Sequence, residues 1–226
     1  MTTRFFYEKP SGNTHAEPDA LWKNMNPTLA KIVHISTGLL MASLWGAFAY
    51  RHGLAFHQSG QWEYLLIALS ETLTATFFIL RSAPETVSSD PLDWLFAIAG
   101  TFTPLFFSPS EWGVLPWARH LVMVGMALQI VGMISLNRSF ALVAAKRQVK
   151  TRGLYRYVRH PLYASYLVMF TGYTLANTTP INVLLYVMTI GFLYVRLVRE
   201  EKHLAIDTSY AAYMQQVRFR VIPFVF

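Results

Sequence analysis

Long apolar segments alternate with short polar ones along most of this chain. Six of the apolar segments approach the length of about 20 residues that a helix needs to cross a bilayer. Backbone groups in lipid must find hydrogen-bond partners within their own segment, which favours helices. The predicted spans are 29–50, 62–80, 92–107, 120–136, 162–176 and 181–198.

The pattern divides the chain into three regions. Residues 1–28 are polar and carry several prolines, so an irregular N-terminal tail is expected. Residues 29–136 hold the N-terminal membrane helices, and residues 137–226 form a separate C-terminal region. Near the end, Asp207 is one of several residues able to cap a short amphipathic helix that starts close to Tyr210. The expected fold is an all-α transmembrane bundle.

Composition agrees with a membrane location. The chain is 54% hydrophobic and 14% charged, against about 25% charged residues in soluble domains. It contains no cysteine, which excludes disulfides and cysteine-ligated metals. Small residues such as Gly125 and Gly132 are expected to let helices approach closely.

The net charge of +7 could indicate a nucleic-acid partner. With six spans, however, only Arg51 and Arg119 of the 19 Lys and Arg residues fall on one side of the membrane. Cytosolic loops carry such an excess of positive charge, so both termini and the 137–161 loop are predicted to be cytosolic. No nucleic acid is needed to explain the charge.

Glu71 is an acidic residue in the middle of the second predicted span. Ionisable residues in membrane helices are candidates for function. Ser70, Thr72 and Thr74 lie close to it in sequence, so we expect Glu71 to bond to a hydroxyl or backbone group of a neighbouring helix.

The stretch 151–166 is the most unusual loop of the chain, because it combines Arg, Tyr and His before an apolar segment. Pro161 suits the first position of a helix, whose free N–H groups then face the loop. A helix N-terminus of this kind binds anions. With Tyr155, His160 and Tyr163 nearby, the loop predicts a pocket with aromatic walls.

A second cluster lies at the end of the last predicted span. Arg196 and Glu200 are four residues apart and share a helix face. The short connection 177–180 predicts a tight helical hairpin that returns this cluster to the membrane surface where His160 lies. Taken singly, these charges could also be interfacial side chains paired along the helix.

Metal binding and Rossmann-type binding are not expected. The residues His160, His203, Glu200 and Glu201 lack a spacing typical of metal ligands. No glycine-rich dinucleotide or phosphate loop is present in the sequence.

The C-terminal region resembles the isoprenylcysteine carboxyl methyltransferase family, within the wider group that includes phospholipid methyltransferases. The resemblance covers residues 137–226, about 40% of the chain. The matching residues are Asn137-Arg138-Ser139-Phe140, then 153–163 with the element Arg159-His160-Pro161-Leu162-Tyr163, then Arg196 with Glu200-Glu201, Tyr210, Tyr213 and Ile222-Pro223.

The resemblance implies S-adenosylmethionine as the cofactor and a lipophilic acceptor, such as a prenylcysteine carboxylate, that enters from the bilayer. It also implies the site residues. Arg196, which would orient the acceptor, and Glu201 are the implied catalytic residues. The implied cofactor-binding residues are Tyr155, His160, Pro161, Leu162, Tyr163 and Glu200.

Two other functions remain open from the sequence. Membrane reductases of the sterol and steroid type, which use NADPH, share an aromatic, Arg-rich loop and an ending similar to Ile222-Pro223-Phe224. A non-enzymatic sensor or scaffold with a degenerate site is the other alternative, because 147–150 departs from the methyltransferase pattern.

Overall fold

The computed structural model describes residues 26–60, 62–84, 86–88, 90–108, 110–139, 145–146 and 149–225. The predicted N-terminal tail, 1–28, lies almost wholly outside these ranges, as do residues 147–148 of the atypical loop.

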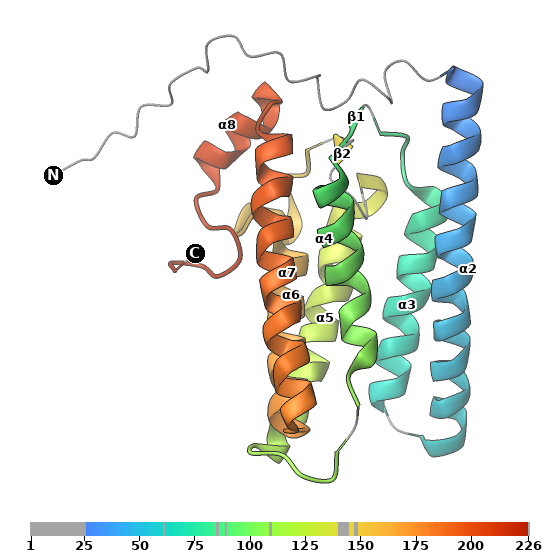
Figure 1. The fold of residues 1–226 in the computed structure, drawn as a ribbon, viewed down its shortest axis with the longest axis vertical. Coiled ribbons are helices and arrows are strands. Elements are labelled where there is room, and N and C mark those ends of the chain that lie inside the picture. The colour runs from blue at the N-terminus through green and yellow to red at the C-terminus, as the bar shows by residue number, and fades with distance from the viewer. Residues whose placement is uncertain are drawn as a thin grey trace, which may run out of the picture.

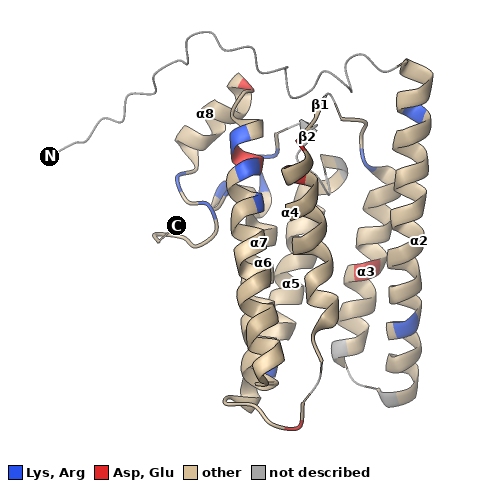
Figure 2. Ribbon diagram, viewed as in Figure 1, with Lys and Arg blue, Asp and Glu red and all other residues tan. Residues whose placement is uncertain are grey.

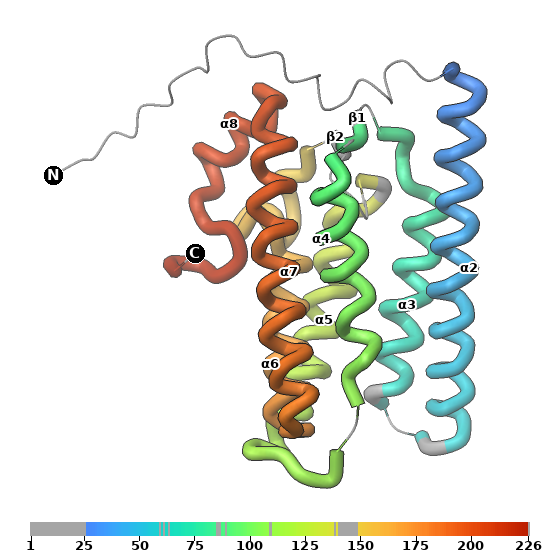
Figure 3. The backbone as a smooth tube through the Cα atoms, viewed as in Figure 1, coloured from blue at the N-terminus to red at the C-terminus, as the bar shows by residue number. Residues whose placement is uncertain are grey.

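Six helices run side by side as a bundle (Figure 1), and the smooth trace of the backbone follows the same path (Figure 3). In the described part of the chain, each of the six predicted spans corresponds to one helix. The helices are α2 (Pro27–Ser59), α3 (Trp62–Leu80), α4 (Pro91–Phe102), α5 (Arg119–Leu136), α6 (Pro161–Ala176) and α7 (Pro180–Leu204).

A seventh helix, α8 (Thr208–Gln216), lies beside the end of α7. Its N-cap is Asp207, whose carboxylate accepts hydrogen bonds from the backbone N–H groups of Ser209 and Tyr210. The predicted C-terminal helix is therefore confirmed, with its start two residues earlier than expected.

Three helical segments are long and apolar enough to cross a membrane: Pro27–Gln58, Pro116–Leu136 and Pro180–Leu204. The chain is thus a multi-pass membrane protein. The other apolar helices are shorter, and α4 and α6 have only 12 and 16 residues. At 1.5 Å per residue, α6 is about 24 Å long. Six complete spans remain a prediction.

The shortness of α4 has a local cause. Pro104 cannot donate the hydrogen bond that would continue the α-helix. The chain instead tightens into the 3-10 turn η1 (Thr103–Phe106), so helical structure ends at Phe106.

Proline and side-chain caps define most helix starts. Proline is the first residue of α2, α4, α6 and α7. At α7, the side chain of Thr179 accepts a hydrogen bond from the backbone N–H of Asn182. Three residues separate α6 from α7, so the predicted tight hairpin is confirmed.

Helices α2 and α3 pack together, as do α5 with α6 and α4 with α7. Close approach of α5 and α6 depends on glycine. A methyl group added at Gly125 would lie 2.7 Å from the backbone nitrogen of Met169, and one added at Gly172 would lie 2.8 Å from the carbonyl oxygen of Ala118. The predicted role of Gly125 as a small interhelical contact is confirmed.

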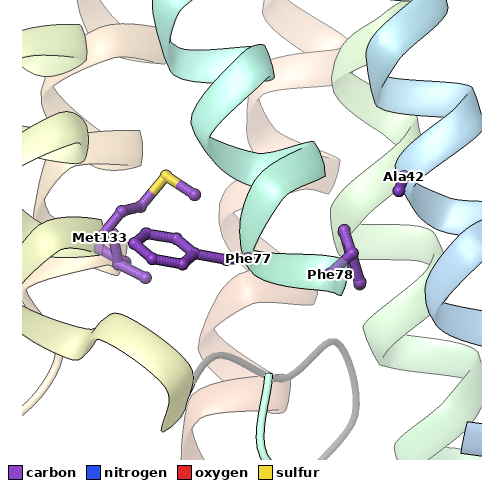
Figure 4. Packing of buried hydrophobic residues seen from close by; sticks show 5 residues of the cluster. Ala42, Phe77, Phe78 and Met133 are labelled. Carbon is purple, nitrogen blue, oxygen red and sulfur yellow. The ribbon is translucent and has the colours of Figure 1, made fainter. Parts of the chain in front are cut away.

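The buried core lies between these pairs. Phe77 and Phe78, adjacent on α3, face opposite ways: Phe77 lies against Met133 of α5 and Phe78 lies toward Ala42 of α2 (Figure 4). Leu162 of α6 completes this cluster. The outward surfaces carry many exposed Leu, Ile and Val side chains, as expected of helices that face lipid.

Glu71 bonds to a residue that the sequence did not suggest. Its Oε2 lies 2.8 Å from Nδ1 of His52 on α2. The neighbouring threonines Thr72 and Thr74 instead donate to carbonyls four residues earlier in their own helix. The expectation of a hydroxyl or backbone partner was therefore wrong, because the facing helix supplies an imidazole.

Charged residues gather at the end of the bundle where α8 lies (Figure 2). There, the guanidinium of Arg199 on α7 pairs with Asp90 and Asp93 at the start of α4. Two short strands, β1 (Thr86–Val87) and β2 (Ala145–Lys146), pair antiparallel beside this contact. That the charged end faces the cytosol remains a prediction.

Candidate active site

The 151–166 stretch folds as a short 3-10 turn followed by the first residues of α6. The turn η4 (Gly153–Arg156) begins at Gly153, whose φ of +63° favours glycine. A methyl group there would also lie 2.3 Å from Oγ of Ser135. Pro161 is the first residue of α6, as predicted, and His160 is its N-cap residue.

A cavity of about 170 Å³ opens between this loop, α8 and the upper parts of the helices. Six of the eight residues proposed from the sequence line it: Tyr155, His160, Leu162, Tyr163, Arg196 and Glu200. The two clusters therefore meet, as their placement on α6 and α7 predicted. Pro161 and Glu201 are buried behind the wall rather than in it.

Across the cavity, the hydroxyl of Tyr163 donates a 2.7 Å hydrogen bond to Oε2 of Glu200. The ring of His160 packs edge-on against that of Tyr163, with centroids 5.3 Å apart. Tyr163 therefore contacts both the carboxylate of Glu200 and the imidazole of His160.

Arg196 is held from two sides. Its guanidinium carbon lies 5.6 Å from the centre of the Tyr163 ring, and Nη1 donates a 3.2 Å hydrogen bond to Oγ1 of Thr101 on α4. Stacking on a ring and bonding to a hydroxyl restrict the side chain. A restricted guanidinium is well suited to bind a planar anion.

Glu201 is the centre of a buried network. Its side chain is 4% exposed. Oε1 accepts hydrogen bonds from Nε of Arg159 at 2.6 Å and lies 3.0 Å from Nε2 of His160. Oε2 accepts from Nε of Arg220 at 2.7 Å. A buried carboxylate needs such partners, since an unpaired charge away from water is very costly.

This network also fastens the C-terminal segment 217–220 to the loop. The backbone N–H groups of Arg159 and His160 donate to the carbonyls of Phe219 and Arg220, at 2.9 and 2.8 Å. Nη1 of Arg159 donates to the carbonyl of Val217 at 3.0 Å. The loop that carries His160 therefore depends on residues near the C-terminus for its backbone position.

The helix α8 covers the cavity with aromatic side chains. The hydroxyl of Tyr213 donates a 2.6 Å hydrogen bond to the carbonyl of Tyr155. Burial raises the pKa of Tyr155, Tyr210 and Tyr213 above the ordinary tyrosine value, so all three phenols are neutral at physiological pH. These neutral rings add apolar surface to a wall that also contains the charged side chains of Lys150, Arg159, Arg196 and Glu200.

The hydroxyl of Tyr210 stands out, because it is buried and has no hydrogen-bond partner among the described residues. Buried polar groups in folded proteins are nearly always paired. Since Tyr210 lines the cavity, a bound molecule could supply the missing partner.

The rest of the lining was not predicted from the sequence. It includes residues from the N-terminal helices and α5, namely Trp45, Thr74, Phe78, Thr101 and Gln129. None of them belongs to a recognisable motif, and their positions depend on how α2, α3 and α4 pack against the C-terminal helices. Within the described ranges, no group of three or more His, Asp and Glu residues is arranged to hold a metal ion.

The residues present suit S-adenosylmethionine. Glu200 can accept hydrogen bonds from its amino or ribose hydroxyl groups, and the first turn of α6 can bind its carboxylate. Aromatic faces attract its sulfonium cation.

Comparison with known protein families identifies the part of the chain that contains these site residues. Residues 116–211, less than half of the chain, match the family model described as Phospholipid methyltransferase. No curated protein gives a significant match. Residues 116–211 are thus similar to the phospholipid methyltransferases, membrane enzymes that use S-adenosylmethionine, and the match does not single out the isoprenylcysteine branch of their superfamily.

Proposed function

We propose that this protein is an integral membrane methyltransferase that transfers a methyl group from S-adenosylmethionine to a lipophilic acceptor. The observation that carries the proposal is the meeting of Tyr163, Glu200 and Arg196 in one cavity, within the region that matches the methyltransferase family. The family match favours this function over a reductase.

The cofactor would occupy the side of the cavity next to η4 and α8. Bound there, it supplies an electrophilic methyl group. Tyr155, His160, Leu162, Tyr163 and Glu200 would form its binding surface, with Glu200 as the hydrogen-bond acceptor. Pro161 would contribute indirectly, by starting α6 where its free N–H groups face the loop.

The acceptor would reach the same cavity from the bilayer, on the side where Trp45 and Phe78 line it. Arg196 would bind an anionic group of the acceptor, since a guanidinium fork matches a carboxylate or phosphate. A prenylcysteine-type carboxylate and an amine lipid with a neighbouring phosphate both fit this description.

Catalysis would come mainly from positioning. Methyl transfer requires the acceptor atom in line with the bond that breaks, and holding both reactants in this geometry lowers the barrier. A carboxylate acceptor is already ionised near neutral pH, so it needs no general base. The cavity contains a group to position each reactant. Arg196 would be the fixed cation for the acceptor, and Glu200 would be the carboxylate for the cofactor.

Glu201 would act through other residues. Its carboxylate contacts Arg159, His160 and Arg220 rather than the cavity. We therefore assign it a positioning role, in which it orients the imidazole of His160 and holds the loop.

Calorimetric titration of the detergent-purified protein with S-adenosylhomocysteine tests the reaction class, with NADPH titrated in parallel. Binding of S-adenosylhomocysteine that is lost in Glu200→Gln and kept in Glu111→Gln supports the proposal. Glu111 is a suitable control because it is exposed and follows Ser110, whose N–H bonds to Asn177 at the far end of α6. Binding of NADPH alone would instead indicate a reductase.

Arg196→Lys tests the acceptor role, with Arg199→Lys as control because Arg199 pairs with α4. Turnover is assayed with a prenylcysteine analogue and with phosphatidylethanolamine. We expect Arg196→Lys to lose turnover of the accepted compound while its affinity for S-adenosylhomocysteine stays unchanged. Equal turnover in both variants would show that Arg196 does not bind the acceptor.

A further inference from the structure

The chain after α8 ends in an exposed turn. The N–H of Val225 donates a 3.2 Å hydrogen bond to the carbonyl of Ile222, which places Pro223 and Phe224 at the two central positions of a β-turn. Phe224 has a φ of +66°. Proline followed by a residue with positive φ is the arrangement of a type II turn, in which glycine or asparagine usually takes the second position.

A phenylalanine at this position is unfavourable for the backbone, because a side chain is strained where φ is positive. The protein itself gains little from this side chain, since Phe224 is 89% exposed, although its ring lies 5.2 Å from that of Phe219. Its neighbour Val225 is 77% exposed. A strained position that presents two apolar side chains outward indicates a contact outside the protein.

The position of the turn indicates what that contact is. The C-terminal end lies beside α7, near the middle of that helix and below the level of α8 (Figure 1). The charged residues of α7 gather above this level, toward α8 (Figure 2). Since α7 is one of the helices able to cross the membrane, the turn lies on the apolar side of these charges, where lipid is expected.

The charges around the turn complement such a surface. The exposed side chain of Arg218 precedes the apolar tip, whereas Arg220, between them, pairs with Glu201. Apolar residues next to basic ones are typical of segments that insert at the interface of membranes with anionic lipids.

We propose that the 222–225 turn inserts into the headgroup–acyl boundary of the membrane that the bundle crosses, and that this contact holds segment 217–220 against the cofactor loop. The second half of the proposal rests on the proposed function. The connection is direct, because the carbonyls of Phe219 and Arg220 accept the N–H groups of Arg159 and His160. Displacement of the turn would therefore move the backbone at the start of α6.

Single-cysteine labelling tests the insertion, since the natural chain contains no cysteine. A nitroxide is attached to Phe224→Cys, Val225→Cys and the control Gln215→Cys, an exposed position on α8. The proteins are placed in phosphatidylcholine–phosphatidylglycerol vesicles. We expect the labels at 224 and 225 to be relaxed more strongly by oxygen than by a water-soluble nickel chelate, and the label at 215 to show the reverse.

Labels at 224 and 225 that behave like the label at 215 would overturn the insertion. This readout involves no cofactor, so it stands or fails independently of the methyltransferase assignment. An immobile label shielded from both relaxants would indicate a protein partner on this turn and would also overturn it.

The coupling is tested with Phe224→Asp in the same vesicles, with Gln215→Asp as the charge-matched control. We expect Phe224→Asp to weaken binding of S-adenosylhomocysteine about fivefold or more, the usual lower range of coupling between sites, and the control to leave it unchanged. Unchanged affinity in Phe224→Asp would overturn the link between the turn and the cofactor loop.

Discussion

The hydroxyl of Tyr163 and the carboxylate of Glu200, which are 37 residues apart in sequence, form a 2.7 Å hydrogen bond across the cavity. One residue belongs to the first turn of α6 and the other to the last turns of α7. The bond therefore joins the two clusters that the sequence placed on separate helices. It also fixes the orientation of the carboxylate proposed to bind the cofactor.

Removal of this hydroxyl should weaken cofactor binding. A hydrogen bond to a charged group contributes about 1.5–3 kcal/mol, so we expect Tyr163→Phe to reduce the affinity for S-adenosylhomocysteine roughly 10- to 100-fold. Calorimetry measures the change. The control is Tyr173→Phe, which removes a hydroxyl from the far end of the same helix. Equal affinities in the two variants would show that the bond does not orient Glu200.

Tyr210→Phe should weaken cofactor binding without lowering the stability of the protein. The hydroxyl of Tyr210 has no partner among the described residues, so its removal should leave the thermal midpoint of the apo protein unchanged or raise it. If the bound cofactor supplies the partner, affinity for S-adenosylhomocysteine should fall about 5- to 10-fold, which corresponds to one neutral hydrogen bond. Unchanged affinity would place this hydroxyl away from the cofactor.

Glu201→Ala should destabilise the protein far more than Glu200→Gln. Breaking a buried ion pair by removing one partner costs about 3–5 kcal/mol, because Arg159 and His160 would remain buried without their carboxylate. Thermal unfolding of the purified variants in detergent provides the comparison. A Glu201→Ala variant with a normal midpoint that binds S-adenosylhomocysteine normally and yet lacks turnover would favour the catalytic role suggested by the sequence.

The glycines of the bundle allow a matched test of packing. Gly125→Ala should destabilise α5 against α6 by about 1–3 kcal/mol, since the added methyl would overlap Met169. Gly191→Ala is the control, because nothing lies within 4 Å of the methyl that it adds on α7. Alanine is favoured over glycine in helices, so the control should unfold at an equal or higher temperature. Similar losses in both variants would contradict this packing.

Several of these features could be predicted from the sequence because their causes are local. The length of apolar segments predicted the helices, Pro161 predicted the start of α6, and the short 177–180 connection predicted that Arg196 and Glu200 would return to the side of His160. In each case one segment, or two adjacent in sequence, contained the necessary information.

The features that the sequence did not predict depend on packing between distant segments. Trp45 and Phe78 reach the cavity because α2 packs on α3 and α3 packs on α5. His52 is the partner of Glu71 because α2 faces α3 in that register. The pairing of 217–220 with the loop before α6 follows from where α8 ends. No pattern in the sequence specifies these alignments.

The three buried tyrosines predict how stability depends on pH. Burial raises the pKa of Tyr155, Tyr210 and Tyr213 in the folded protein, whereas in the unfolded chain each phenol ionises near its ordinary pKa of about 10. The unfolded chain therefore releases protons that the folded protein retains. The stabilisation by these neutral phenols is complete below pH 10 or so and is lost as the pH rises through the higher folded pKa values.

We therefore expect the free energy of unfolding to fall by about 1.4 kcal/mol per pH unit for each of these tyrosines well above pH 10. Denaturant unfolding in detergent between pH 8 and pH 11 measures the slope. Tyr210→Phe removes one of the three groups without removing a hydrogen bond between described residues, so its slope should be smaller than that of the natural protein. An identical slope in the two proteins would mean that Tyr210 ionises as readily in the folded protein as in the unfolded chain, and hence that α8 does not keep it buried.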